Sequence, residues 1–162
     1  MASLIYYVLT YGLTAIGAFG VVSVVQEQTG DDKLPNFAGL SRRAPIVSLC
    51  MMIFMLSLAG IPPLAGFFGK FYLFVAAAAI DPANLGLLWL VILAVAMSAV
   101  SLYYYIQVLK QIYVVPALMG GSEQPAPVIS QVVLSVIALA VIVFGCAPNL
   151  LLGKLLTVLQ IF

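Results

Sequence analysis

Lys70 is the residue whose type and setting most clearly point to chemistry in this chain of 162 residues. It stands within Gly66-Phe67-Phe68-Gly69-Lys70-Phe71 and is the only charge between Ala44 and Ile80. An ammonium group inside a bilayer costs at least about 2.5–3.5 kcal/mol, so an ionisable residue at that depth is a functional candidate by default. Ten uncharged residues separate it from Asp81, which places it well inside its apolar run.

Proton exchange is the chemistry that a buried lysine offers. An arginine could not perform it, because a guanidinium keeps its proton. We expect two effects to disfavour the charged form of Lys70: the loss of surrounding water and a nearby positive helix N-terminus after the prolines. The alternative is that Lys70 snorkels along its apolar stem to the membrane surface. Its depth in the run favours a proton relay over snorkelling.

A relay needs partners, and the sequence offers few of them. All five carboxylates lie in loops or at the ends of apolar runs. The remaining candidates for a secondary relay are hydroxyl groups and one further cation: Ser98, Ser101, Tyr103, Tyr104, Tyr105 and Lys110. For the three tyrosines, an interfacial aromatic belt is the stronger interpretation, because tyrosines near the end of a span commonly serve that purpose.

The composition is that of a membrane protein. Hydrophobic residues make up 65% of the chain and charged residues 7%, against about 25% charged in soluble domains. The net charge of +1 leaves no basic stripe for a nucleic acid. The chain has no histidine, and Cys50 and Cys146 both lie in apolar runs. We therefore expect no metal site, no disulfide framework and no cofactor bound by this chain.

Apolar runs predict the spans that must position Lys70. A bilayer core about 30 Å thick needs about 20 apolar residues of helix, and three charge-free runs meet this length: 2–25, 85–109 and 128–152. The first run is too long for a signal peptide and lacks a basic region before it, so we expect it to be a retained span. The loops are too short for a soluble domain. The sequence therefore predicts one membrane domain over residues 1–162.

The stretch from Ala44 to Ile80 is too long for one straight span, and Gly60-Ile61-Pro62-Pro63 interrupts it. Two adjacent prolines break a helix, so the chain crosses either twice or once as two half-helices, 44–59 and 65–80. Cytoplasmic loops accumulate Lys and Arg, which favours a single broken crossing. That topology leaves Lys154 alone on one side and gathers the other cations opposite: Lys33, Arg42, Arg43 and Lys110. We expect an all-α bundle with four crossings, one of them discontinuous.

Four segments resemble a known family, the antiporter-like proton-translocating subunits of respiratory complex I. Among these subunits the pattern is most similar to the N-type subunits of bacterial NADH-quinone oxidoreductase. The stretch that carries most of the similarity runs from Leu56 to Phe74, LSLAGIPPLAGFFGKFYLF. The other matching segments are 11–19 (YGLTAIGAF), 40–45 (LSRRAP) and 98–105 (SAVSLYYY).

The resemblance implies a fold of fourteen helices in two inverted repeats, of which this chain resembles the last four, about a third. Lys70 would be the proton-relay lysine of a broken helix, and the residues around the break would support it: Gly60, Pro62, Pro63, Gly66 and Gly69. The function implied is proton translocation coupled to NADH oxidation and quinone reduction, as an enzyme subunit in a bacterial inner membrane. NADH, FMN, iron-sulfur clusters and quinone would belong to the parent complex, and other membrane-arm subunits and the bilayer would be the partners.

Two other functions remain open at this point. Mrp-type cation/proton antiporters share the fold, so the chain could exchange Na⁺ for protons. It could also be a structural membrane fragment without transport. Lys70 argues against the structural interpretation, because a scaffold gains nothing from a charge inside the membrane.

Overall fold

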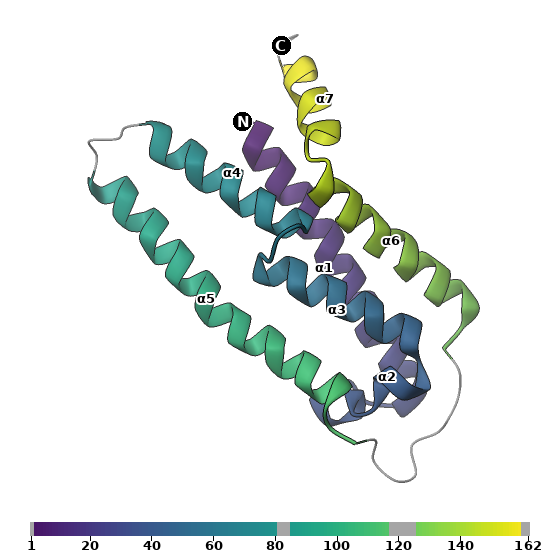
Figure 1. Ribbon diagram of the computed structural model, residues 1–162. Coiled ribbons are helices and arrows are strands. Elements are labelled where there is room, and N and C mark those ends of the chain that lie inside the picture. The colour runs from purple at the N-terminus through teal and green to yellow at the C-terminus, as the bar shows by residue number, and fades with distance from the viewer. Residues whose placement is uncertain (1, 81–84, 117–125, 160–162) are drawn as a thin grey trace.

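The structure is a computed structural model that describes residues 2–80, 85–116 and 126–159. These residues form helices and no strand, which confirms the all-α prediction for this part of the chain (Figure 1). In chain order the elements are α1 (Ala2–Thr29), the 3-10 helix η1 (Leu34–Phe37), α2 (Leu40–Arg43), α3 (Pro45–Ala59), α4 (Ala65–Ile80), α5 (Leu85–Tyr113), α6 (Val128–Cys146) and α7 (Asn149–Leu159).

Three of these helices are long and apolar enough to cross a membrane: Ala2–Thr29, Leu88–Tyr113 and Val128–Cys146. The helices α3 and α4 are also apolar, but they have 15 and 16 residues. At about 1.5 Å per residue, each is only about 22–24 Å long. Neither reaches across a hydrocarbon core of about 30 Å by itself.

The core lies where α1, α3 and α6 pack together. Phe54 of α3 is fully buried and fits against Gly17 of α1, where an added Cβ would lie 2.4 Å from its ring. The Tyr6 hydroxyl of α1 donates a 2.7 Å hydrogen bond to the Phe144 carbonyl of α6. Small residues at contacts and hydrogen bonds between helices are the two means by which membrane helices associate.

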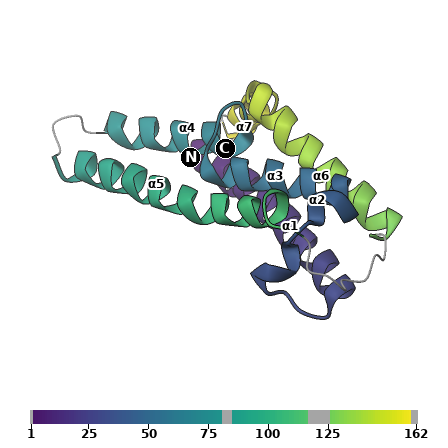
Figure 2. The same ribbon diagram turned by 60° about the horizontal axis from the view of Figure 1, so that its bottom comes forward.

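The helix α5 lies along the outside of this core. Figure 1 shows it running beside both α3 and α4, and the turned view in Figure 2 shows the same arrangement. Its lower end is joined to α2, because the Ser41 hydroxyl donates a 3.1 Å hydrogen bond to the Ile112 carbonyl. This bond places the C-terminal end of α5 at the same end of the bundle as the start of α3. Many apolar side chains of α5 are exposed, among them Trp89 and Ile92.

The last apolar run differs from our expectation of a span over 128–152. The helix α6 ends at Cys146, and α7 begins at Asn149 in a different direction (Figure 1). Pro148 explains the break, because its ring cannot continue a helix and it has no backbone N–H to donate. The carbonyls of Ala147 and Pro148 instead accept hydrogen bonds from the first turn of α7.

Candidate functional site

The site is built at the break between α3 and α4. Gly60 ends α3 with a φ of +82°, a conformation that glycine adopts without a Cβ penalty. The Gly60 N–H bonds to the Ser57 carbonyl at 3.0 Å and the Ile61 N–H to the Leu56 carbonyl at 3.0 Å, the Schellman arrangement. Pro62 and Pro63 follow, so the helix cannot resume before Ala65.

Three glycines let the chain segments at the break approach closely. An added Cβ at Gly66 would lie 1.9 Å from the Ser57 carbonyl oxygen, so α4 starts directly against the end of α3. At Gly69 it would lie 3.2 Å from the Thr10 hydroxyl oxygen of α1. At Gly145 of α6 it would lie 2.1 Å from the Pro63 carbonyl oxygen. The break is therefore held from three sides, by α3, α1 and α6.

Lys70 lies one turn into α4 and reaches back across this break. Its ammonium donates to the Leu58 carbonyl at 2.9 Å and to the Ser98 hydroxyl of α5 at 2.7 Å. Within residues 2–80, 85–116 and 126–159, the one ion pair joins Lys33 to Asp31. In the part of the chain that the structure describes, Lys70 is therefore held by neutral groups from two other helices.

Lys70 also meets a helix end that we did not expect. It bonds to the Leu58 carbonyl, which belongs to the last turn of α3. Carbonyls at a helix C-terminus carry partial negative charge and are suitable partners for a cation. The end of α3 thus supplies a partner for Lys70, in addition to the start of α4 that we expected close to it.

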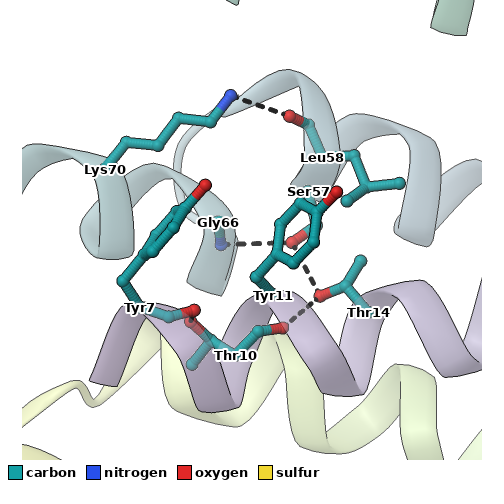
Figure 3. Close-up of a pocket in the computed structure, with 8 residues that line it drawn as sticks. All are labelled: Tyr7, Thr10, Tyr11, Thr14, Ser57, Leu58, Gly66 and Lys70. Atoms are coloured by element: carbon teal, nitrogen blue, oxygen red, sulfur yellow. Dashed lines mark hydrogen bonds between the residues drawn. The ribbon is translucent and has the colours of Figure 1, made fainter. Parts of the chain in front are cut away.

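A layer of buried hydroxyl groups, from Thr10 and Thr14 of α1 and Ser57 of α3, lines the same cavity as Lys70 (Figure 3). Thr14 and Ser57 are both buried, and their hydroxyl oxygens are 3.5 Å apart. The Ser57 hydroxyl oxygen also accepts the Gly66 N–H at 3.1 Å, so it joins the two half-helices. Thr10 lies one turn before Thr14 on α1 and is equally buried.

Lys70 lines two cavities on different sides. On the α1 side lies a small cavity, whose other lining residues are Tyr7, Thr10, Tyr11, Thr14, Ser57, Leu58 and Gly66. On the α5 side lies an apolar groove of about 250 Å³, lined by Phe67, Phe71, Ser98 and Leu102 among others. The Lys70 side chain therefore borders one cavity towards α1 and another towards α5.

The structure brings one of the candidate relay residues, Ser98, into contact with Lys70. The Ser101 hydroxyl instead donates to the Met97 carbonyl of its own helix at 3.0 Å. The side chains of Tyr103 and Tyr104 are 61% and 64% exposed, and Lys110 is also exposed. All four residues follow Ser98 on α5.

Sequence reasoning missed the hydroxyl layer of Thr10, Thr14 and Ser57. A hydroxyl in a long apolar run gives no signal of its own, because Ser and Thr can satisfy themselves by bonding to the carbonyl four residues earlier. The one available sign was spacing: Thr10 and Thr14 are four residues apart and share a helix face.

Comparison with known proteins decides the family. The profile of the family described as NADH:quinone oxidoreductase/Mrp antiporter, transmembrane region, matches residues 1–101. The chain belongs to this family. The match covers α1 to α4 and the Lys70–Ser98 contact.

The relatives in this family include N-type subunits of NADH-quinone oxidoreductase. The chain is 53% identical over 152 residues to NADH-quinone oxidoreductase subunit N 2 of Acidobacterium capsulatum, covering 94% of this chain and 30% of the relative. It is 41% identical to the subunit N 2 of Herpetosiphon aurantiacus, covering 94% of this chain and 27% of that protein. The chain thus spans about a third or less of the relatives' length, and it is similar to their C-terminal portion.

A solved structure is similar as well. A chain of respiratory complex I from Thermus thermophilus with bound aureothin superposes with a TM-score of 0.75 at 32% sequence identity. The similarity covers 93% of this chain and 34% of that one. The family, the N-type relatives and the complex I neighbour agree that this is a membrane protein of the complex I type.

Proposed function

We propose that the chain is part of the N-type membrane-arm subunit of a bacterial NADH-quinone oxidoreductase and that Lys70 exchanges a proton there during translocation. The observation that carries this proposal is the position of the Lys70 ammonium at the helix break, bonded to Leu58 and Ser98. An intramembrane charge is costly, so a site built from three helices around one lysine supports a functional role.

The proposed topology has four crossings in the bacterial inner membrane, with α3 and α4 together forming one discontinuous crossing. Their combined 31 residues, 15 and 16, give about 46 Å of helix, close to the about 43 Å expected for the 29 residues of α5 beside them. The Ser41–Ile112 bond supports this topology, because it ties the start of α3 to the end of α5. A single crossing also keeps Arg42, Arg43 and Lys110 on one side, as the loop charges favour.

Lys70 has two neighbours with different abilities in this scheme. The Leu58 carbonyl accepts a hydrogen bond but cannot carry a proton further. The Ser98 hydroxyl both accepts and donates, so it can pass a proton along. Ser98 therefore acts as the first relay group towards α5, and the carbonyl stabilises the ammonium between transfers.

The redox chemistry belongs to other subunits in this proposal. This chain would bind no NADH, flavin, iron-sulfur cluster or quinone, and quinone reduction elsewhere in the complex would drive the proton step. The parent complex is then the enzyme, a translocase, and its other membrane-arm subunits are the partners of this chain.

Proton pumping by inverted membrane vesicles tests the proposal. Acidification started by NADH is compared between the wild type and Lys70→Ala, with Lys154→Ala as a control that removes an exposed cation of α7. NADH oxidation by an artificial acceptor, which bypasses the membrane arm, measures how much complex is assembled.

We expect Lys70→Ala to lose most of the acidification at a normal artificial-acceptor rate, while Lys154→Ala pumps normally. Full pumping by Lys70→Ala would remove the relay role. Acidification that required an imposed Na⁺ gradient and no NADH would assign the chain to an antiporter instead.

A further inference from the structure

Phenylalanine side chains form one wall of the apolar groove between α4 and α5. Phe67 and Phe71 are one turn apart on α4, and their rings stack with centroids 5.9 Å apart. Residues three and four apart share a helix face, so Phe74 continues this wall. The two helices lie side by side (Figure 1), and the opposite wall comes from one face of α5: Val95, Ala99 and Leu102.

The Lys70 ammonium lies at this groove. It donates to the Ser98 hydroxyl at 2.7 Å, and a Cβ added at Gly60 would lie 3.7 Å from its nitrogen. Ser98 and Gly60 both line the groove, as Lys70 itself does. Of the ten lining residues, two carry polar side chains, Lys70 and Ser98. The groove thus combines apolar walls with one cationic, hydrogen-bonding point.

The charge of Lys70 has no carboxylate partner within residues 2–80, 85–116 and 126–159. Its ammonium has three hydrogens, of which two are bonded to Leu58 and Ser98. A charge in apolar surroundings is costly unless an opposite charge and hydrogen bonds compensate it. A ligand that complements this groove therefore carries a negative group at one end and an apolar remainder.

A carboxylic acid with an alkyl chain has both features. It enters the hydrocarbon region in its neutral form, whereas a phosphate headgroup stays charged and hydrated at the membrane surface. Small-molecule sites are mostly apolar, with a few polar groups that fix the orientation of the ligand. The groove volume of about 250 Å³ lies just below the roughly 300–1,000 Å³ typical of such sites, so it suits an acid of medium chain length.

We propose that the groove between α4 and α5 binds a medium-chain fatty acid, whose carboxylate bonds to the Lys70 ammonium and whose alkyl chain lies against Phe67 and Phe71. The Ser98 hydroxyl can donate as well as accept, so it holds the second carboxylate oxygen. The carboxylate balances the charge of Lys70, and the chain covers apolar side chains of both helices.

Bound fatty acid would inhibit proton exchange, a consequence that rests on the proposed function. When the neutral acid meets the neutral amine of Lys70, its O–H bond breaks and one N–H bond forms, which leaves a carboxylate and an ammonium. The net charge of the site does not change. The carboxylate then holds the ammonium by a charge-assisted hydrogen bond, so the proton of Lys70 is withheld from the relay. The reverse transfer releases the neutral acid.

Photolabelling of the assembled oxidoreductase tests the site. The probe is a decanoic acid analogue with a diazirine near the end of its chain, and peptide mass spectrometry locates the labelled residues. Val95→Phe fills the groove. Val100→Phe is the matched control, because Val100 is 51% exposed against 50% for Val95 but does not line the groove. Lys70→Ala removes the cation.

Two competitors separate recognition of the acid from ordinary contact with an apolar chain. Unlabelled decanoic acid is compared with methyl decanoate, which has the same chain but neither an acid proton nor a charge. Quinone-linked NADH oxidation by the solubilised complex, relative to the artificial-acceptor rate, provides the second measurement. It needs no proton gradient, so leakage of protons through the fatty acid does not affect it.

We expect label on groove residues of α4 and α5 in the wild type and Val100→Phe, and about tenfold less label in Lys70→Ala and Val95→Phe. Methyl decanoate should compete at least about tenfold more weakly than decanoic acid, as loss of a hydrogen bond to a charged group predicts. Decanoic acid should slow quinone-linked NADH oxidation by the wild type and Val100→Phe, while Val95→Phe resists it.

Equal competition by the ester in the wild type would overturn the site, because an apolar chain alone would then suffice, and this result needs no variant to assemble. Equal labelling of Val95→Phe and Val100→Phe would also overturn it. A groove that takes no label, together with a Lys70→Ala complex that does not pump, would reject the fatty-acid site and leave the proposed function standing.

Discussion

Gly66→Ala tests how tightly the two half-helices are joined. The new Cβ would lie 1.9 Å from the Ser57 carbonyl oxygen, where real contacts do not fall below 3.0 Å, so the helices must separate by about 1.1 Å. Overpacking of this kind costs about 1–3 kcal/mol. The Gly66 N–H bond to the Ser57 hydroxyl would weaken as well, which costs about 0.5–1.5 kcal/mol. We expect a total of roughly 2–4 kcal/mol.

The assay heats the assembled complex to a series of temperatures and measures on native gels how much of it remains intact. Gly12→Ala is the matched control, because an added Cβ there meets nothing within 4 Å and alanine favours a helix over glycine by about 1 kcal/mol. We expect Gly66→Ala to disassemble at clearly lower temperature and Gly12→Ala to match or exceed the wild type. Equal stability of the two variants would refute the close contact at the break.

Two further predictions follow from single contacts, and a third follows from the proposed topology. Ser98→Ala removes the α5 partner of Lys70 and should slow NADH-driven acidification about tenfold, with Ser98→Thr restoring it. Tyr6→Phe removes the bond to the Phe144 carbonyl and should destabilise the assembled complex by about 1 kcal/mol, measured by the same heating assay; no change would mean that the bond is not formed. Leu64→Cys should resist impermeant maleimides from both sides, because a single discontinuous crossing keeps the turn inside the membrane; rapid labelling from the periplasm would indicate two crossings.

The break in the helix could be predicted from sequence because its cause is local. Pro62 and Pro63 lack an N–H, and no packing can supply one, so the residue types alone decide that α3 cannot continue. Pro148 carried the same signal near the end of the last run, and α6 ends just before it. The helix α1 extends beyond its apolar run to Thr29, because hydropathy marks the part of a helix that suits lipid and not the point where its hydrogen bonds end.

The partners of Lys70 could not be predicted in the same way. They come from α3 and α5, and which helix faces meet in the bundle depends on packing between residues far apart in the chain, such as Gly17 with Phe54. The Leu58 carbonyl is a backbone group, so the residue type at position 58 does not identify it as a partner of Lys70. Ser98 was one of several hydroxyls on its helix, and only the three-dimensional contact singles it out.

Proton pumping by Lys70→Arg tests the central claim most directly. Arginine keeps the positive charge and can still donate hydrogen bonds to the Leu58 carbonyl and the Ser98 hydroxyl, but it holds its proton at all relevant pH values. The measurement is NADH-driven acidification in inverted vesicles, relative to NADH oxidation by an artificial acceptor. If Lys70 exchanges a proton, the assembled Lys70→Arg complex will fall to a small fraction of wild-type pumping. Wild-type pumping by that variant would contradict the claim and show that only the charge of Lys70 matters.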